Sequence, residues 1–371
     1  MKLYSQKDVD RRALKGARIA ILGYGSQGRA HALNLQDSGF DVVVGVRRGG
    51  AGWKQARREG LQVAEPAQAV QGADLVAILV PDPVQKEFYQ GIRKGLKPGA
   101  AVLFAHGFNV HFRQIKPAKH LDVVLIAPKG PGDLVRRQYE EGRGVPCLLA
   151  VAQDATGTAH ARALAYAHGI GGTRGGVIET TFAEETETDL FGEQAVLCGG
   201  ATELVVKGFE TLVEEVYQPE VAYYECLHEL KLIVDLLHEG GLAKMHQFIS
   251  ETAKYGDLTR GPRIVNERVK NEMRKVLKEV RSGRFARQWI RENAQGRPNY
   301  QKLLAADIDH QIERVGAGLR ARMPWLQEKR RSAPAAAARG GRAAPRRAKP
   351  ARRKSVKRAR GESAGAVRHA A

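Results

Sequence analysis

Short apolar runs recur through the first half of the chain, and stretches with helical periodicity separate most of them. The runs fall at residues 18–22, 41–46, 75–80, 101–105, 123–127 and 147–151. They do not alternate between apolar and polar positions, which is typical of strands buried on both faces of a sheet. The pattern therefore predicts an α/β fold, with a doubly wound parallel sheet formed by residues 1–181.

Strand-like runs disappear after Thr181, and helical periodicity dominates as far as residue 327. The expected helices are 184–216, 220–239, 241–254, 262–281, 284–294 and 298–319. No internal repeat accompanies them. The pattern predicts a second, all-helical domain over residues 182–327.

Residues 328–371 have a different composition, dominated by Ala, Arg, Lys, Pro and Gly. They contain 11 Arg and 4 Lys against 2 Glu, a balance of +13 out of the net charge of +20 for the whole chain. With so few apolar side chains to bury, we expect a disordered basic tail. Such a tail either binds polyanions weakly or is a solvated extension, and it has no aromatic residue for stacking on bases.

The remaining composition narrows the class of protein. The 371 residues are enough for two or three domains. The three cysteines, Cys147, Cys198 and Cys226, have no metal-ligand spacing, which favours a reducing compartment. No stretch approaches the roughly 20 apolar residues of a membrane span, and the first residues lack the apolar core of a signal peptide. We therefore expect a cytoplasmic protein with no membrane partner.

The first apolar run ends in a glycine-rich turn, Gly23–Gly28, and a helical pattern follows. A GxGxxG turn between a strand and a helix lets a dinucleotide pyrophosphate approach the backbone and rest on the helix N-terminus. We predict that this turn binds a dinucleotide cofactor through Tyr24, Gly25, Ser26 and Gln27. The alternative is a structural turn that binds nothing.

Two arginines, Arg47 and Arg48, follow the second apolar run. At this place NAD-dependent enzymes carry an acid for the ribose 2′-hydroxyl, whereas an arginine pair suits the 2′-phosphate of NADP. The pair therefore favours NADPH as the cofactor. The alternative is two solvated surface arginines.

Two carboxylate pairs occur in the predicted helical domain. Asp189 and Glu193 stand four residues apart, so they project from one face if the stretch is helical. Glu225 and Glu229 repeat the spacing among the apolar residues of 226–237, which we expect in the core. Because carboxylates on apolar helices are costly unless they are paired or bound to a metal, the two pairs predict a site for a hard cation.

Three further acids, Glu184, Glu185 and Glu187, precede the first pair. Acidic residues in the first turn of a helix complement its dipole, which explains these three without any ligand. The same explanation is the alternative for the first carboxylate pair, but it fits the apolar surroundings of the second pair poorly.

Several longer strings occur together with the glycine-rich turn, at residues 104–109, 127–132, 177–182, 184–200 and 224–231. With these strings the chain resembles, over residues 1–327, the short bacterial (class I) ketol-acid reductoisomerases, also called acetohydroxy-acid isomeroreductases. The resemblance implies a Rossmann-like N-terminal domain and a helical domain that is knotted. It also implies an NADP-dependent oxidoreductase of valine, leucine and isoleucine biosynthesis.

The activity that the resemblance implies has two steps. An alkyl group migrates within 2-acetolactate or 2-aceto-2-hydroxybutyrate in a Mg²⁺-dependent step, and NADPH then reduces the product to the 2,3-dihydroxy acid. The implied ligands of two Mg²⁺ ions are Asp189, Glu193, Glu225 and Glu229. They would come from both subunits of a homodimer or higher homo-oligomer that shares its active sites.

The resemblance assigns further roles. His106 and Lys129 would be catalytic, with Lys129 assisting proton transfer or holding metal-bound water, and Ser250 would contact the substrate. Taken alone, these residues would be a structural histidine, an exposed lysine and an ordinary serine. The residues that would lie along the cofactor are Asp82, Pro83, Val84, Gln85 and Gly132.

The chain departs from the family pattern in several places. Gly50 and Gly52 replace serines that usually bind the 2′-phosphate, which weakens the argument for NADPH and allows NADH. Asp133 and Leu134 stand where His-Thr is common, and the basic tail has no counterpart. Two other functions stay open: a 3-hydroxyacid dehydrogenase, which needs no set of metal-binding carboxylates, and a polyanion-binding protein.

Overall fold

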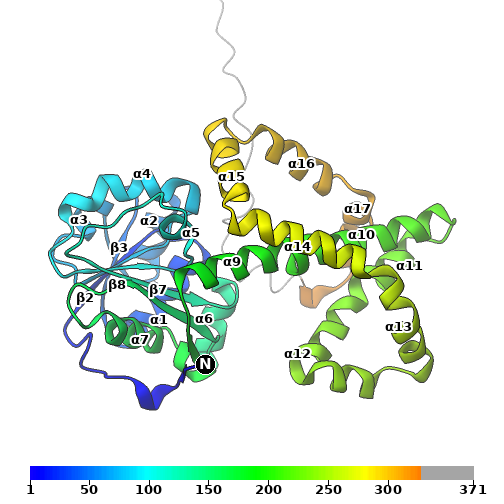
Figure 1. Ribbon diagram of the computed structural model, residues 1–371, viewed down its shortest axis with the longest axis horizontal. Coiled ribbons are helices and arrows are strands. Elements are labelled where there is room, and N and C mark those ends of the chain that lie inside the picture. The colour runs from blue at the N-terminus through cyan, green and yellow to red at the C-terminus, as the bar shows by residue number, and fades with distance from the viewer. Residues whose placement is uncertain (327–371) are drawn as a thin grey trace, which may run out of the picture. The chain divides into compact units, whose positions relative to one another are not determined.

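The computed structural model describes residues 1–326, so the predicted tail at 328–371 lies outside them. Within these residues, nine strands form one sheet in the order β1-β9-β8-β7-β6-β5-β2-β3-β4. Figure 1 shows the sheet with helices packed around it. All six predicted runs are strands of this sheet. The strands are β1 (Leu3–Tyr4), β2 (Arg18–Leu22), β3 (Asp41–Gly45), β4 (Gln62–Ala64), β5 (Leu75–Ile78), β6 (Ala101–Phe104), β7 (Asp122–Pro128), β8 (Cys147–Gln153) and β9 (Val177–Glu179).

Each face of the sheet buries a separate core. Along β2, Ile19 and Ile21 belong to one core, and Ala20 and Leu22 belong to the other. The polar positions of an alternating pattern are missing because helices cover both faces. These helices and their short neighbours are α1 (Ser26–Asp37), α2 (Ala51–Arg58), α3 (Pro66–Ala69), α4 (Asp82–Ile92), α5 (Phe108–His111), α6 (Gly132–Glu140), α7 (Ala159–Gly169) and α8 (Gly172–Gly175).

The sheet is mostly parallel, but it is not wholly so. β8, predicted as a further parallel strand, runs antiparallel to β7, and Leu125 pairs with Ala150. The two-residue β1 is also antiparallel to its neighbour β9. An apolar run that is buried on both faces carries no information about strand direction, which is why the sequence pattern missed this reversal.

The parallel strands bring several loops to one edge of the sheet. The loops after β2, β3, β5, β6 and β7 all leave from the carboxyl ends of strands that pair in parallel. They contain the glycine-rich turn, the arginine pair, Asp82, His106 and Lys129 in that order. This is the edge at which doubly wound folds bind ligands.

From Phe182 to residue 326 the regular elements are helices. Two of them are single π-helical turns, η3 (Glu193–Leu197) and η4 (Tyr224–His228). The others are α9 (Phe182–Gly192), α10 (Gly199–Glu214), α11 (Pro219–Tyr223), α12 (Glu229–Phe248), α13 (Glu251–Ile264), α14 (Glu267–Arg281), α15 (Arg284–Ala294), α16 (Pro298–Ile308) and α17 (Gln311–Ala321).

Only one of the predicted helices, 284–294, has the bounds that the sequence suggested. The prediction of continuous helices over 184–216 and 220–239 was wrong, because a π-helical turn interrupts each stretch. The predicted break at residue 240 is a kink at Gly240 and Gly241 inside α12.

Three further helix boundaries differ from the prediction for a shared reason. The predicted helices 241–254, 262–281 and 298–319 are each divided at a residue whose side chain accepts a backbone N–H at the start of the next helix. These capping residues are Ser250, Asn266 and His310. Hydrophobic periodicity continues across such a cap, so it does not locate the boundary.

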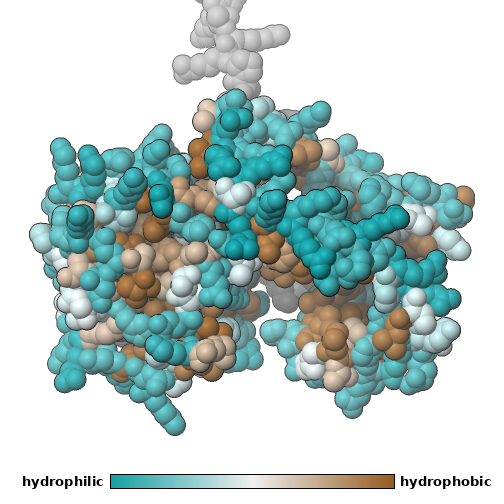
Figure 2. Space-filling view, viewed as in Figure 1, coloured by the Kyte–Doolittle hydropathy of each residue, from teal (hydrophilic) through white to brown (hydrophobic). Residues whose placement is uncertain are grey.

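Much of the apolar surface of the helical part is exposed in the single chain. Leu230 and Leu232, which were expected in the core beside Glu229, are exposed, and Leu242 and Phe248 of α12 are 68% and 64% exposed. Figure 2 shows apolar side chains gathered over α12. None of the helices among residues 1–326 is long and apolar enough to cross a membrane.

Candidate active site

The helix α9 carries the acidic stretch, and its start is capped as the sequence predicts. Thr181 is the N-cap, and its Oγ1 accepts a hydrogen bond from the backbone N–H of Glu184 at 3.0 Å. The Glu184 carboxylate is exposed and accepts a hydrogen bond from Thr180 Oγ1 at 2.6 Å. Glu184 therefore serves the helix start, as expected.

The expectation that Glu185 and Glu187 do the same is not met. Glu185 is 1% exposed, and its carboxylate accepts from the backbone N–H of Gly107 at 2.9 Å and from Lys129 Nζ at 3.2 Å. Glu187 forms an ion pair with Arg281 of α14 at 3.4 Å, and its carboxylate lies 3.5 Å from His111 Nε2 of α5. Both acids face protein groups across from α9, where burial and pairing outweigh the helix dipole.

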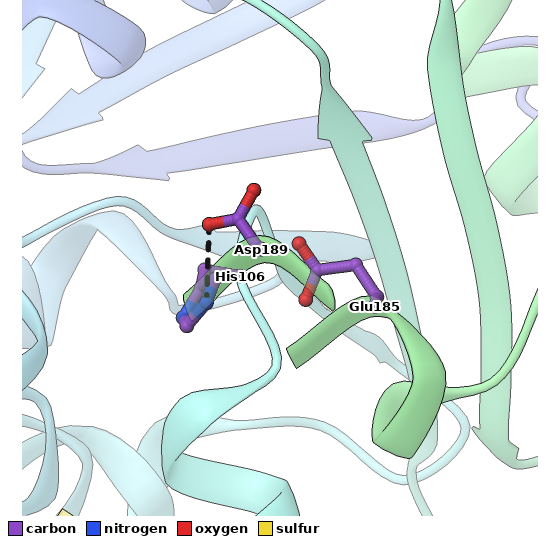
Figure 3. A group of neighbouring side chains, drawn as sticks. All are labelled: His106, Glu185 and Asp189. Carbon is purple, nitrogen blue, oxygen red and sulfur yellow. Dashed lines mark ion pairs between the residues drawn. The ribbon is translucent and has the colours of Figure 1, made fainter. Parts of the chain in front are cut away.

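Three side chains from two distant segments converge at this place. His106 lies in the loop after β6, and Glu185 and Asp189 come from successive turns of α9, with ligand atoms of the three residues within 4.8 Å of one another. Figure 3 shows the two carboxylates and the imidazole ring turned toward a common space. Lys129 Nζ donates to Asp189 Oδ1 at 2.8 Å, so it joins the two acids.

The imidazole of His106 has a defined orientation. Its Nδ1 accepts a hydrogen bond from the backbone N–H of Phe108 at 3.3 Å, so the neutral ring carries its proton on Nε2. This Nε2 lies 3.4 Å from Asp189 Oδ2 and is buried, with no hydrogen-bond partner among the described residues. A buried polar atom without a partner is unusual, and it indicates a site that a further ligand completes.

The charged groups of the site perturb one another. Burial alone would lower the pKa of Lys129, but Glu185 and Asp189 outweigh it and raise the pKa above its usual value. Burial raises the pKa of Asp82; His106 partly opposes this, and the two α9 carboxylates add to it. Such mutual perturbation is common where titratable groups are assembled for chemistry or for metal binding.

Glu193 follows Asp189 by one turn and begins the first π-helical turn. Partial burial and the Asp189 carboxylate raise the pKa of Glu193. The wider turn is closed by a hydrogen bond from Cys198 N–H to Glu193 O at 3.0 Å. A Cβ on Gly199 or Gly200 would lie 2.2 or 2.1 Å from a carbonyl oxygen of this turn, so both positions require glycine.

The second π-helical turn carries the other predicted carboxylate pair. Glu225 lies within η4, and Glu229 closes that turn by donating its N–H to Tyr224 O. Both side chains are exposed, and neither belongs to the group formed by His106, Glu185 and Asp189. The single chain therefore presents the two predicted ligand pairs separately, each beside a π-helical turn, a feature often found at functional sites.

Ser250, the predicted substrate contact, has a structural role in the single chain. It is the N-cap of α13, and its Oγ accepts from the N–H of Ala253 at 3.1 Å. The structure does not place Ser250 in the group around His106.

The glycine-rich turn has the geometry of a ligand-binding loop. Gly23 has a φ of 102°, and a Cβ on Gly28 would lie 2.3 Å from the Gly23 carbonyl oxygen. By contrast, apart from the adjacent residues of the chain, no protein atom lies within 4 Å of where a Cβ on Gly25 would stand. The open position at Gly25, at the N-cap of α1, leaves the approach that a pyrophosphate group needs.

The glycine-rich turn is attached to the loop of Lys129. Gln27 Nε2 donates to the carbonyl oxygen of Gly130 at 2.9 Å. A Cβ on Gly132 would lie 2.2 Å from the carbonyl oxygen of Ser26, so only glycine lets the two segments touch. The outer side of the turn is fixed by Tyr24, whose hydroxyl donates to Glu59 at 2.6 Å.

The arginine pair is exposed at the β3–α2 loop. Arg48 lies 3.8 Å from Glu65 and over the ring of Trp53, whereas Arg47 forms no ion pair among the described residues. A Cβ on Gly50 would lie 3.1 Å from the Arg47 carbonyl oxygen. The loop therefore presents the Arg47 guanidinium without an ion-pair partner and the Arg48 guanidinium close to the Glu65 carboxylate.

The segment Asp82–Gln85 forms the first turn of α4, which begins at Asp82. Val84 is exposed, but Gln85 is buried, and its amide bonds to Val80 O, Asp82 Oδ1 and Asn109 Nδ2. The buried Gln85 side chain therefore links α4 to Asn109 of α5 through hydrogen bonds. The accessible positions of this turn are Asp82, Pro83 and Val84.

Sequence reasoning missed Glu185 as a member of the site. The signal was available, since Glu185 and Asp189 share the four-residue spacing that singled out Asp189 and Glu193. This spacing was not distinctive, because several acidic residues lie close together and any of them could complement the helix dipole at its start.

The fold and the site together define a nicotinamide-dependent oxidoreductase with a helical second half. Two solved structures share the fold at low identity. One is a putative oxidoreductase from Jannaschia sp. CCS1 (TM-score 0.54, 14% identity, 71% of this chain and 97% of that chain). The other is a semialdehyde dehydrogenase NAD-binding protein from Cupriavidus necator (TM-score 0.52, 19% identity, 70% and 99%).

Matches to models of protein families identify the family within this class of oxidoreductases. Residues 13–176 match the NADPH-binding domain of acetohydroxy acid isomeroreductase, and residues 182–325 match the C-terminal domain of ketol-acid reductoisomerase. The chain is 44% identical to an NADH-preferring ketol-acid reductoisomerase from an uncultured archean, with a TM-score of 0.84 over 86% of this chain and 99% of that chain. The chain belongs to the ketol-acid reductoisomerase family.

Proposed function

We propose that this enzyme catalyses the Mg²⁺-dependent alkyl migration of 2-acetolactate or 2-aceto-2-hydroxybutyrate and then the NADPH-dependent reduction to the 2,3-dihydroxy acid. This reaction belongs to valine, leucine and isoleucine biosynthesis. The observation that carries the proposal is the group of Lys129, Glu185, Asp189 and His106 beside the glycine-rich turn. It combines metal-binding oxygens, a proton carrier and a cofactor loop at one edge of the sheet.

The donor set fits magnesium. Mg²⁺ prefers oxygen ligands and keeps part of its water. Partial burial and the Asp189 carboxylate raise the pKa of Glu193, so the two negative charges lie close enough for a cation to relieve their repulsion. We propose that Asp189 and Glu193 hold two Mg²⁺ together with Glu225 and Glu229. Bound there, the ions would polarise substrate oxygens and fix the substrate in place.

The chain's own groups supply the proton handling. Lys129 Nζ is held between two carboxylates and keeps its proton, so it can donate to a substrate oxygen or to an ordered water. His106 Nε2 lies 3.4 Å from Asp189 Oδ2 without a hydrogen bond, so its proton is available to a bound oxygen atom. Glu185 is 1% exposed and accepts hydrogen bonds from Lys129 and from the Gly107 N–H, which suits a role in holding the lysine.

The cofactor is proposed to be NADPH, with NADH accepted as well. Arg47 is free to bind a 2′-phosphate, but Arg48 is already near Glu65, and Gly50 and Gly52 offer no hydroxyl groups. The similar archean enzyme prefers NADH. A dinucleotide would lie along Tyr24–Gln27, with its reactive end toward Asp82 and the Lys129 loop.

Completion of the site requires a second chain. Glu225 and Glu229 are exposed, and α12 exposes apolar side chains that one chain leaves uncovered. Contiguous apolar surface of this kind favours a protein interface. We propose a homodimer or higher oligomer in which these two carboxylates reach Asp189 and Glu193 of the neighbouring chain, and a division of each chain into domains 1–181 and 182–327.

The proposal is tested by steady-state assays of the purified full-length protein. Oxidation of NADPH, and more weakly of NADH, is expected with 2-acetolactate and Mg²⁺, and excess EDTA should abolish it. Absence of turnover with either cofactor contradicts the proposal, and activity that persists in EDTA favours a 3-hydroxyacid dehydrogenase instead. Ser250→Ala is expected to raise the KM for 2-acetolactate, and an unchanged KM would remove Ser250 from the site.

A further inference from the structure

A cleft of about 640 Å³ lies between the second half of α4 and the loop that follows α5. These two helices are neighbours in the structure (Figure 1). Five of the side chains that line the cleft are cationic: Lys86, Arg93, Lys94, Arg113 and Lys116. None of its lining residues belongs to the candidate active site, so the cleft is a separate feature of the sheet domain.

The positive charge in this cleft is not compensated. No acidic residue lines the cleft, and among residues 1–326 none of the five cations is within ion-pair distance of a carboxylate. Elsewhere in the same domain cations are paired, for example Lys97 with Asp74 at 2.5 Å and Arg162 with Asp122 at 3.3 Å. Other cations among residues 1–326, such as Arg47, also form no ion pair, but the cleft gathers five unpaired cations on one concave surface.

Helix electrostatics explains only part of the set. Arg93 and Lys94 follow the last turn of α4, where cations complement the helix dipole. Lys86 lies in the second turn, where that interaction is weak, and Arg113 and Lys116 belong to the opposite wall. Arg113 has a φ of 55°, a left-handed conformation that is uncommon for a residue other than glycine. Arg113 therefore has a strained backbone conformation at the position where its side chain lines the cleft.

We propose that this cleft binds a small anion with two or more phosphate groups. Lysine and arginine donors on two walls of a concave surface focus the positive potential and match several phosphate oxygens at once. The volume lies in the range of small-molecule sites. Tyr89, the aromatic residue of the cleft, is buried, so no aromatic ring is available for stacking a nucleic-acid base.

The test uses the full-length protein and inorganic orthophosphate, pyrophosphate and tripolyphosphate at constant ionic strength. The glycine-rich turn and the tail can also attract phosphate, so the readout must be local. Tripolyphosphate is expected to slow backbone hydrogen exchange in residues 86–95 and 113–118, more than pyrophosphate does, and orthophosphate least. Exchange there that is unchanged by tripolyphosphate overturns the proposal.

Matched double variants make the test specific. Arg113→Gln with Lys116→Gln should weaken the tripolyphosphate effect at least about tenfold, since each removes a charge-assisted hydrogen bond. Lys7→Gln with Arg137→Gln removes the same charge from exposed positions outside the cleft and should change it less than about twofold. Equal losses in the two variants would mean nonspecific attraction and would overturn the proposal.

A second double variant, on the opposite wall of the cleft, distinguishes loss of binding from a folding defect. Arg93→Gln with Lys94→Gln should reproduce the loss with an unchanged far-ultraviolet circular dichroism spectrum. If a 12-nucleotide single strand protects both segments at lower concentration than tripolyphosphate does, the cleft is a nucleic-acid site and the small-anion proposal is wrong.

Discussion

Gln27 donates a hydrogen bond to the carbonyl oxygen of Gly130 at 2.9 Å, and so joins the glycine-rich turn to the loop that carries Lys129. These residues are more than one hundred positions apart in the chain. The bond makes the position of Lys129 depend on the conformation of the proposed cofactor loop.

Replacing Gln27 by Met should weaken cofactor binding and turnover together. The loss of one hydrogen bond corresponds to about 1 kcal/mol, or roughly fivefold in each parameter. Gln36→Met is the matched control, because Gln36 also lies on α1 and donates to a glycine carbonyl, Gly60 O, at 3.2 Å. Equal effects of the two variants on kcat and KM would show that the Gln27 bond has no special part in the site.

Asp189→Asn should abolish turnover and leave the sheet domain folded. The variant keeps the size of the side chain but removes the charge that a metal ligand needs, so a loss of at least about a hundredfold in kcat is expected. Magnesium titration by calorimetry should show the same loss. Glu184→Gln, on the same helix but exposed, is the control and should keep full activity. Full activity of Asp189→Asn would remove it from the metal site.

Gly200→Ala should disturb the first π-helical turn. Its Cβ would lie 2.1 Å from the Ala195 carbonyl oxygen, and such overpacking costs about 1–3 kcal/mol. Because the turn begins at Glu193, magnesium affinity should fall as well. Gly192→Ala is the control in the same segment, since its Cβ would meet only a side-chain carbon of Leu197 at 3.7 Å. Unchanged magnesium affinity in Gly200→Ala would separate the turn from metal binding.

Glu65→Gln should shift cofactor preference toward NADPH. Glu65 lies 3.8 Å from Arg48, and its removal frees this guanidinium for a 2′-phosphate. Exposed ion pairs contribute about 0.2–1 kcal/mol, so the ratio of kcat/KM for NADPH over NADH should rise by a factor of about 1.4 to 5. Glu87→Gln, which is exposed and outside the β3–α2 loop, should leave the ratio unchanged. A ratio that falls in Glu65→Gln would contradict the role of Arg48.

His31 should make the stability of the sheet domain sensitive to acid. Its ring is fully buried, its Nδ1 contacts Tyr166 Oη at 2.9 Å, and burial lowers the pKa of His31 to about 3. Between about pH 6.5 and 3 the unfolded chain binds a proton that the folded chain does not bind, so stability falls as the pH falls. From pH 7 to 5 the loss should be about 2 kcal/mol.

Urea denaturation of the wild type and of His31→Asn at several pH values measures this contribution. The variant should be less stable at pH 7 but should lose less stability on acidification. Parallel pH curves for the two proteins would show that His31 does not titrate in this window.

The sequence predicted the sheet well because its strands are buried on both faces, so their apolar runs are short and uninterrupted. It could not predict the direction of β8, since direction depends on long-range pairing with β7. The helix boundaries at Ser250 and Asn266 were missed for a local reason, because a single capping hydrogen bond ends a helix without changing the hydrophobic pattern.

The candidate site was predicted in part. His106, Lys129 and Asp189 were named from the sequence, and the structure brings them together. Glu185 was assigned to the helix start because the sequence does not reveal that its side chain turns toward Gly107. The core expected around Glu225 and Glu229 is only partly buried in the single chain, with Leu230 and Leu232 exposed. Apolar residues cover interfaces as well as cores, and the sequence does not distinguish the two.

The exposed carboxylates Glu225 and Glu229 have a thermodynamic consequence if they complete the metal site of a neighbouring chain. Metal binding and chain association are then linked equilibria, so each must strengthen the other by the same factor. Magnesium would drive association of dilute protein, and concentrated protein would bind magnesium at lower free metal. The specific activity would then fall on dilution at fixed magnesium and recover when more of the metal is added.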